Sequence, residues 1–396
     1  MLRTELLDPV QDEDEFYELT LYAFNRKNTP QRQRFFSQLY QNSHAYGVRN
    51  DNLLESGFLS IPFTTQIDDD RFKASGISYV SSYPEVSGHG NIGKMMEKAF
   101  SDYWESGVVL SYLAPFSFPF YRRFGYEEVF DRVHYRLKNI DVPRMKPIDE
   151  DKIRIERHSF NDALPLLSNF YDQHPNSRKG GIERSNWWNN YLAVKHDHWE
   201  VALCYRGDLL DGYMVYQREQ NVAFRIQELF YHSHSTLQSL LAFAAKHASA
   251  YQMFDYVSGD PEPRPDIFPD PHIKRSLSIQ IEAYMMARIV NLQRFFDQYH
   301  VSKNTRDDFV LNVHDDFIPA NEGVWQISIA NGTIQATKSD ENTINAIEIT
   351  VQDLTKIMFG YRSASQITTS DFDTVAAAHL NHLCKPNLVP MLWDYF

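Results

Sequence analysis

A glycine-rich turn in the first quarter of the chain has the composition of a phosphate-binding loop. The residues from Gly88 to Gly93 read GHGNIG and precede a segment with helical apolar spacing, which we expect to run from about Ile92 to Ser106. A strand, a glycine turn and a helix N-terminus together present unpaired backbone N–H groups that suit a pyrophosphate. Glycine also lets a ligand approach the backbone closely. The turn therefore predicts an anion-binding site formed mainly by backbone atoms.

The same turn fits the pattern G-x-G-x-x-G of dinucleotide-binding folds. In those folds the turn follows the first strand of a βαβ unit, and an acidic residue stands about 20 positions further on. Here Gly88 comes late in its unit, after several strand-like segments that look antiparallel. A dinucleotide site is therefore disfavoured, and a glycine turn that binds no ligand remains the alternative.

A second segment, Phe120–Tyr126 (FYRRFGY), combines aromatic rings, two arginines and a glycine. Arginine suits phosphate groups because its planar guanidinium forms paired hydrogen bonds. We expect a short helix over Phe120–Gly125 and then a strand over Glu128–Lys138. The alternative is that Tyr121 and Phe124 are core residues, a role that we expect for Phe124 in any case.

Two further groups of polar residues are weaker candidates. His379, His382 and Cys384 lack a fourth ligand at zinc spacing, so we predict no metal site. The acidic run Asp12–Glu15 is typical of a solvated face. Asp394, beside the last residues of the sequence, is a better candidate for binding an amine.

The elements that would position these residues form three successive units. In the first, we expect helices at Glu13–Asn25 and Gln31–Asn42 and strands at His44–Val48, Leu54–Thr65, Arg71–Ser82 and Val108–Leu113. The second follows a proline-containing linker at Asp141–Asp151. There we expect strands at Ile153–His158, His198–Tyr205, Gly212–Arg218, Ala223–Phe230 and Met253–Ser258, and helices at Asn161–Gln173, Glu183–Val194 and Ser235–Ala250. The order of elements echoes the first unit and indicates a diverged internal duplication.

The third unit follows a loop at Gly259–Pro271 that is rich in proline and acidic residues. The Asn331-Gly332 pair is a strong hairpin signal between two of its strands. A strand at Ile281–Ile289 comes between the loop and this unit. The remaining elements are strands at Phe309–Val313, Val324–Ile329, Thr333–Thr337 and Ala346–Thr350, with helices at Asn291–His300, Val351–Phe359 and Phe372–Leu383. We therefore predict a smaller α+β domain at the end of the chain.

Composition limits the classes of function. The chain has 396 residues, of which 43% are hydrophobic and 23% charged, which suits two or three soluble domains. We find no apolar run of about 18 residues and no signal-peptide pattern at the N-terminus. Two distant cysteines favour a reducing, cytoplasmic setting. The formal net charge of −13 disfavours nucleic acid as a partner.

Together the motifs resemble those of the Eis family (enhanced intracellular survival acetyltransferases), within the GNAT acyltransferases. The resemblance rests on Ser75–Pro84 (SGISYVSSYP), the glycine turn, Tyr121–Tyr126 and the aromatic end Trp393–Phe396. It covers the whole chain. The GNAT turn usually reads Arg or Gln, two residues, Gly, one residue, Gly or Ala, whereas this chain has Ser87 and Ile92 at the outer positions.

The resemblance implies an α+β architecture of two tandem GNAT domains and a sterol-carrier-protein-like domain. On that reading the domains span 1–140, with the acetyl-coenzyme A site, 152–290, which is degenerate, and 291–396. The segment Tyr231–Ser235 before the last helix of the second unit has no glycine turn, so we expect one cofactor site per chain. The family also implies a homo-oligomer, a hexamer.

The resemblance further implies roles for individual residues. Tyr126 matches the general acid that protonates the departing thiolate of coenzyme A, and the α-carboxylate of Phe396 matches the general base. The residues that match cofactor-binding positions are Val80, Ser81, Ser82, Gly88, His89, Gly90, Asn91, Ile92, Gly93, Tyr121 and Arg122.

The activity implied is direct acetyl transfer from acetyl-coenzyme A to amines of cationic acceptors, aminoglycoside-like or polyamine-like. One alternative is a non-catalytic protein that binds acyl-coenzyme A or lipid, with the third domain as the ligand module. Another is a protein lysine acetyltransferase. We expect neither a nucleic acid nor a membrane as partner.

Overall fold

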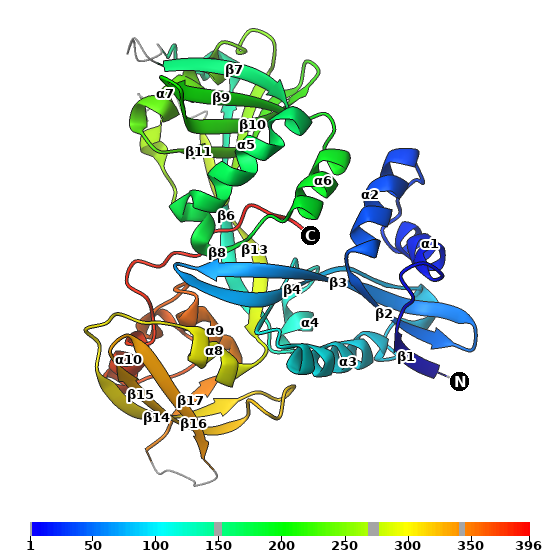
Figure 1. The fold of residues 1–396 in the computed structure, drawn as a ribbon, viewed down its shortest axis with the longest axis vertical. Coiled ribbons are helices and arrows are strands. Elements are labelled where there is room, and N and C mark those ends of the chain that lie inside the picture. Colours follow the sequence, from blue (N-terminus) through cyan, green and yellow to red (C-terminus); the bar gives the residue numbers. More distant parts are fainter. Residues whose placement is uncertain (1, 146–152, 268–276, 340–344) are drawn as a thin grey trace.

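The computed structural model describes residues 2–145, 153–267, 277–339 and 345–396. Figure 1 shows three units: the first at the centre and right, the second above it and the third at the lower left. The first contains, in chain order, β1 (Leu2–Leu6), α1 (Glu13–Ala23), α2 (Pro30–Gln41), β2 (His44–Asn50), β3 (Leu53–Ile67), β4 (Asp70–Ser82), α3 (Asn91–Ser106), β5 (Leu110–Leu113), α4 (Phe118–Arg122) and β6 (Glu127–Lys138).

The helices of the first unit begin and end at residues suited to those positions. The side chain of Thr29 accepts a hydrogen bond from the backbone N–H of Arg32, and Pro30 opens α2. Helix α3 ends at Gly107, whose φ of 77° is left-handed. Its inward face packs on the sheet and carries Met95, Met96, Ala99, Phe100 and Tyr103.

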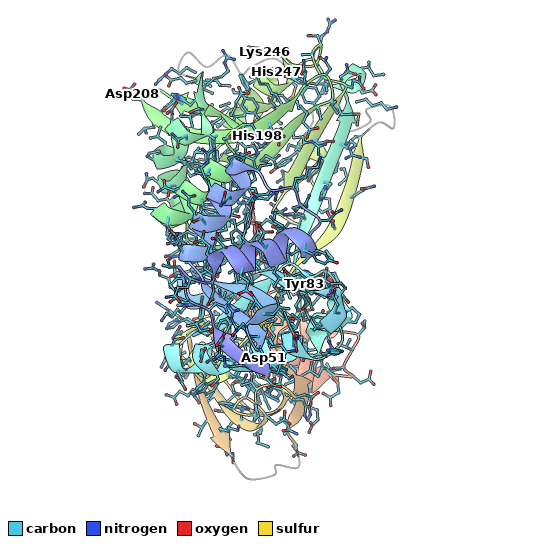
Figure 2. The ribbon with its side chains drawn as sticks, turned by 90° about the vertical axis from the view of Figure 1, so that its right-hand side faces the viewer. Asp51, Tyr83, His198, Asp208, Lys246 and His247 are labelled. Atoms are coloured by element: carbon cyan, nitrogen blue, oxygen red, sulfur yellow. The ribbon has the colours of Figure 1, made fainter. Side chains whose placement is uncertain are left out.

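The second unit repeats the plan of the first. It contains β7 (Ile153–Ser159), α5 (Phe160–Gln173), β8 (Lys179–Ile182), α6 (Asn186–Lys195), β9 (Glu200–Arg206), β10 (Leu209–Glu219), β11 (Ala223–Tyr231), α7 (His234–Ala245), β12 (Met253–Ser258) and β13 (Ser278–Ile289). Its helices α5, α6 and α7 are each capped by a serine side chain: Ser159, Ser185 and Ser233. Figure 2 shows His198, Asp208, Lys246 and His247 in this unit at the top, with Tyr83 near the middle of the molecule and Asp51 below it.

The two units exchange strands. The main sheet has the order β1-β2-β3-β4-β5-β13-β6-β12-β11-β10-β9-β7, so β13 lies between β5 and β6, and β6 lies between β13 and β12. Strand β13 is antiparallel to both neighbours, with Met286 opposite Leu113 on β5 and Ser278 opposite Arg136 on β6. The last strand of each unit therefore completes the sheet of the other, and the pair forms one continuous sheet.

The third unit is a four-stranded sheet with helices. It contains α8 (Leu292–Gln298), β14 (Asp307–His314), β15 (Gly323–Ala330), β16 (Thr333–Ser339), β17 (Ile347–Thr350), α9 (Val351–Met358) and α10 (Thr374–Asn381), in the sheet order β16-β15-β14-β17. Asn331 and Gly332 turn between β15 and β16 with φ of 53° and 85°, as a two-residue hairpin requires. A buried ion pair between Arg288 and Asp315 (Nη2–Oδ2 2.5 Å) joins this unit to β13.

The predicted fold class is confirmed, and the structure corrects several of its elements. Strands β1 and β8 were not predicted. The helix predicted at Glu183–Val194 begins only at Asn186, because Ser185 caps it, and the helix predicted to reach Ala250 ends at Ala245. Residues 146–151 of the predicted linker and 268–271 of the predicted loop lie outside the described residues. No helix in the described ranges is long and apolar enough to cross a membrane.

Candidate active site

The glycine turn ends at an uncapped helix N-terminus. Gly90 is the N-cap of α3, with no side-chain hydrogen bond and a φ of 80°, and Gly88 has a φ of 82°. A Cβ at either position would meet nothing within 4 Å, so the turn is open on that side. The first helical hydrogen bond of α3 joins the backbone N–H of Lys94 to the carbonyl oxygen of Gly90. The three N–H groups before it lack helical acceptors and are available to an anion.

The end of β4 has one free edge. β4 pairs in parallel with β5 only from Ala74 to Ile77, whereas on its other side it stays paired with β3 as far as Ser82. A bulge separates these two parts of β4, and Tyr79 within it has a left-handed φ of 53°. The backbone beyond Ile77 therefore has an unpaired side, which can hydrogen-bond to an extended ligand.

The turn and this edge line a cavity of about 520 Å³, here called the turn cavity. Aromatic side chains close its far side, including Phe317 from the third unit. The lining residues are Val80, Ser81, Ser82, Val86, Ser87, Gly88, Gly90, Asn91, Ile92, Gly93, Glu97, Phe116, Phe120, Arg123, Phe124 and Phe317. The cavity thus combines backbone donors from the turn with aromatic side chains and with one acidic and one basic residue, Glu97 and Arg123.

A second cavity of about 590 Å³, the aromatic cavity, meets the first. Val80 and Phe116 line both. The other lining residues come from α1, α2, β4, α4, α6, the loops after α1, β5 and α6, and the C-terminal tail: Tyr17, Thr20, Leu21, Phe24, Arg26, Gln31, Arg32, Phe35, Phe36, Ile77, Ser78, Tyr79, Ala114, Pro115, Tyr121, Tyr191, Lys195, His196, Tyr395 and Phe396. Two ligands bound in these cavities would meet beside the bulge of β4.

The structure separates the two tyrosines of the Phe120–Tyr126 segment. Both are almost fully buried, with 1% of Tyr121 and none of Tyr126 exposed. The Tyr126 hydroxyl lies 2.6 Å from the Ser111 hydroxyl, and Tyr126 lines neither cavity. Tyr121 lines the aromatic cavity, and its hydroxyl has no hydrogen-bond partner among the described residues. The prediction that Tyr126 is the acid does not fit this geometry, because its phenol is packed away from both cavities.

Burial keeps both phenols protonated. Desolvation raises the pKa of Tyr121 above its usual range, and it raises the pKa of Tyr126 well above that range. A phenol in this state can donate a proton to a departing anion, provided that the anion is within reach. Only Tyr121 meets that condition. Gly125, between the two tyrosines, has a φ of 78°, and Arg288 would lie 2.6 Å from a Cβ there, so the backbone at this point requires glycine.

The C-terminal tail reaches the aromatic cavity from the third unit (Figure 1). The ring of Phe396 packs on that of Phe63 at 5.1 Å and lies against Gly76 of β4. Main-chain contacts hold the tail on the way: Arg132 donates to the Trp393 carbonyl and Tyr284 to that of Asp394. The tail therefore brings Phe396 to the wall of the aromatic cavity, and its role as the base stays a prediction.

Asp394 anchors the tail and does not line the aromatic cavity, although it lines a neighbouring cavity of about 560 Å³. Its predicted role in binding an amine stays a prediction. Its oxygens accept hydrogen bonds from Arg184 (3.1 Å) and the Trp188 indole (2.8 Å), and only 1% of its side chain is exposed. Arg184 also pairs with Glu228, at 2.5 Å. The carboxylate is thus fully used inside the second unit.

Three predicted cofactor residues point elsewhere. Arg122 makes two hydrogen bonds of 2.8 Å to Glu127 and does not line the turn cavity, whereas its neighbour Arg123 does. His89 is exposed and lines neither cavity. The Asn91 side chain turns inward, toward Ser56 at 3.2 Å, so only its backbone can serve a ligand.

The predicted strand and turn residues do come together. Val80, Ser81, Ser82, Gly88, Gly90, Ile92 and Gly93 all line the turn cavity. Sequence reasoning did not find Phe116, Phe317 or the cations Arg26, Arg32 and Lys195. The signal for Arg123 was present, since it stands in the same motif as Arg122, but which of two adjacent arginines faces a cavity depends on the turn of α4.

The histidines considered as metal ligands have another partner. The Nδ1 atoms of His379 and His382 both lie 2.7 Å from Oδ2 of Asp307. In the ranges that the structure describes, no three His, Cys, Asp or Glu side chains are grouped to hold a metal ion. These contacts tie α10 to the start of β14.

Comparisons with known domain families match all three units. An acetyltransferase (GNAT) domain matches residues 10–129, a second acetyltransferase (GNAT) domain matches 180–289, and a sterol carrier protein domain matches 292–391. No curated protein matches the chain.

Solved structures match over the whole length. A conserved protein of unknown function from Enterococcus faecalis V583, described as a probable N-acyltransferase, is 31% identical with full coverage of both chains and a TM-score of 0.92. A GCN5-related N-acetyltransferase from Anabaena variabilis is 17% identical, again with full coverage of both, at a TM-score of 0.86. Eis1 from Mycobacterium abscessus is 16% identical, with full coverage of both chains and a TM-score of 0.79. The last two likenesses concern the fold.

Proposed function

Since the chain belongs to the family of GNAT N-acyltransferases, we propose that it transfers the acetyl group of acetyl-coenzyme A directly to a primary amine. The observation that carries the proposal is the meeting of the two cavities at Val80 and Phe116. One cavity has the backbone donors for a pyrophosphate, and the other has the room for an acceptor. The thioester would lie where they join.

The residues present suit coenzyme A. The free N–H groups at the start of α3 would bind the pyrophosphate, and the open edge of β4 beyond Ile77 would pair with the amides of pantetheine. Arg123 supplies a cation in the turn cavity, and its guanidinium lies 4.5 Å from the centre of the Phe120 ring. The acetyl thioester supplies the activated acyl carbon.

The acid in this proposal is Tyr121. The amine nitrogen attacks the thioester carbon, the carbon–sulfur bond breaks, and the leaving thiolate takes the phenol proton. A phenol with an ordinary pKa of about 10 gives its proton to a thiolate near 8.5 at a cost of about 2 kcal/mol. Burial raises that cost somewhat, since it raises the pKa of Tyr121, but it also ensures that the proton is present.

The base in this proposal is the carboxylate of Phe396, since Phe396 lines the aromatic cavity. The pKa of an alkyl ammonium is near 10 and that of a terminal carboxyl is near 3.5. The difference of roughly six pH units corresponds to about 9 kcal/mol, so a free ammonium would not give its proton to the carboxylate efficiently. The transfer becomes favourable as the nitrogen–carbon bond forms and the nitrogen grows acidic. The carboxylate then accepts the proton, while the thiolate receives one from Tyr121.

Thiol release from acetyl-coenzyme A with a panel of amines tests the proposal. We expect amine-dependent release, and we expect a chain extended by Gly-Ser after Phe396 to lose about 100-fold or more in kcat. Binding of coenzyme A to the extended chain, measured by calorimetry, should stay unchanged because the turn cavity is intact. The same extension at the N-terminus is the control. Full activity of the C-terminally extended chain would disprove the role of the carboxylate.

The cationic acceptor, the protein lysine acceptor, the homo-oligomer and the cytoplasmic location remain predictions. An aminoglycoside, a polyamine and a lysine-containing peptide belong in the amine panel for that reason. The acceptor cavity itself carries further information on the acceptor class.

A further inference from the structure

The wall of the aromatic cavity carries cations and no acidic side chain. Arg26 follows α1, Arg32 lies in the first turn of α2, and Lys195 is the last residue of α6. None of the described residues that line the cavity is Asp or Glu. The whole chain has a formal net charge of −13, so this concentration of positive charge runs against the overall balance.

These cations lack carboxylate partners. Within the described part of the chain, none of the three forms an ion pair, although Arg49, nearby on β2, holds Glu5, Asp12 and Glu15. Arg32 and Lys195 contact mainly neighbouring backbone and aromatic rings. Arg32 Nε donates to the Lys27 carbonyl (3.1 Å), its guanidinium lies 5.7 Å from the Phe35 ring centre, and Lys195 Nζ lies 5.1 Å from the Tyr191 ring centre and 5.9 Å from that of Tyr395.

Among these three cations, Lys195 is the one whose charge a bound anion would stabilise most. It is half-buried, and burial lowers its pKa because desolvation disfavours the ammonium. Asp394 favours the charged form, but that carboxylate is already bound by Arg184 and Trp188. An anion in the cavity would complete the ammonium's coordination, whereas a second cation would be repelled.

Aromatic rings make up much of the rest of the cavity wall, with Thr20, Gln31 and Ser78 as uncharged polar members. The rings from α1, α2, β4 and α6 are Tyr17, Phe24, Phe35, Phe36, Tyr79 and Tyr191. His196 adds no positive charge at neutral pH, because burial and the neighbouring Lys195 lower its pKa to about 3. The ring of His196 stacks on Trp199 at 3.7 Å between centres.

We propose, resting on the acyl transfer proposed above, that the acceptor is an amine whose aromatic or apolar body carries an anionic group, a carboxylate or a phosphate, bound by Lys195 and Arg32. The amine is then presented to the thioester at the junction of the two cavities, and the anion lies on the side of α2 and α6. This acceptor differs in charge from the polycation that the family resemblance implies.

A matched set of acceptors tests the proposal in the full chain. Benzylamine, para-aminomethylbenzoate, para-aminomethylphenylphosphonate and para-xylylenediamine share one body and differ in the distal group: none, carboxylate, phosphonate and ammonium. We expect kcat/KM for at least one anionic member to exceed that for benzylamine by about tenfold, with the diamine lowest. The better of the two anions identifies the acidic group.

Variants locate the effect. Lys195→Met and Arg32→Gln should each reduce the ratio of kcat/KM between the anionic and neutral acceptors, Lys195→Met by about tenfold. Lys195→Arg should keep most of that ratio. Arg34→Gln is the matched control, since Arg34 is on the same helix but exposed and outside the cavity lining. KM for acetyl-coenzyme A should not change, which separates acceptor binding from cofactor binding.

The outcomes distinguish the two proposals. If kcat/KM for the diamine or benzylamine equals that for both anionic amines, the proposal of an anionic acceptor is wrong, and the proposal of acyl transfer stands. If the preference exists but survives Lys195→Met and Arg32→Gln, the assignment to these cations is wrong. If no amine in any panel is acetylated, the proposed function fails and this inference with it.

Discussion

The two GNAT units differ most where a helix follows a central strand. In the first unit, α3 begins at Gly90 with no side-chain cap and faces a cavity of about 520 Å³. In the second, Ser233 caps α7 by accepting from the N–H of Thr236, and Asp211 accepts from the Ser233 hydroxyl at 2.8 Å. The two cavities that α7 helps to line hold only about 50 Å³ each, although a cavity of about 560 Å³ lies beside Glu228 of β11 and Val257 of β12.

This difference shows how one fold can leave a helix N-terminus open to an anion or close it. A serine cap satisfies the helix N-terminus internally, and an adjacent carboxylate repels phosphate. Glycines leave the same N–H groups unused and leave space above them. The second unit has instead become a support, since Arg184, Trp188 and Glu228 hold the tail that carries Phe396 to the first unit.

The supporting role of the second unit is tested most strongly at Arg184. Arg184→Met leaves Glu228 and Asp394 buried without their cation, so we expect the free energy of unfolding to fall by about 3–5 kcal/mol. Chemical denaturation measures the change. Arg225→Met is the control: it removes a half-exposed arginine paired with Glu219 and Asp255, and Asp255 keeps Arg136 as its partner, so the cost should be about 1 kcal/mol or less. Equal losses would mean that the buried network is not special.

The catalytic role of the first unit is tested at its two tyrosines. Tyr121→Phe should lower kcat by about 100-fold with little change in the binding of coenzyme A. Tyr126→Phe removes the hydrogen bond to Ser111 and should mainly lower stability, by about 1–2 kcal/mol. Steady-state kinetics and thermal unfolding of both variants separate the two roles. A larger kcat effect for Tyr126→Phe would reverse the assignment.

The open helix N-terminus is tested at Gly90. Gly90→Ala forces a side chain into a left-handed conformation and places its Cβ on the open side of the turn, at a cost of about 1–2 kcal/mol. We expect the Kd of coenzyme A to rise about tenfold in calorimetry. An unchanged Kd would show that the turn does not contact the cofactor.

The smallest effect is expected at the matching position of the second unit. Ser233→Ala removes the cap of α7 and should lower stability by about 1 kcal/mol, measured as a lower thermal midpoint. The Kd of coenzyme A should be the same as in the parent chain. A weaker affinity would show that the two helix termini are coupled.

Local patterns in the sequence predicted the elements around the site well. The bounds of β4 and α3 follow from alternation and helical spacing next to glycines, and the Asn331-Gly332 hairpin follows from turn chemistry. The presence of Phe396 at the cavity was predicted from resemblance. These features depend on residues close together in the chain or on the family pattern.

The sequence did not indicate features that depend on side-chain packing or on contacts between distant segments. Two tyrosines stand five residues apart, and which of them reaches a cavity depends on the burial of Tyr126 against Ser111 and Phe100. Arg122 finds Glu127 on the next strand, which leaves Arg123 for the cavity. The exchange of β6 and β13 links residues far apart in sequence, so no local periodicity indicates it.

That exchange of strands sets a condition on how the protein is made. During synthesis the chain leaves the ribosome from its N-terminus, and a domain can normally close once its last strand has emerged. Here β5 pairs with β13, which ends at Ile289, so the first unit cannot complete its sheet until the second has been translated.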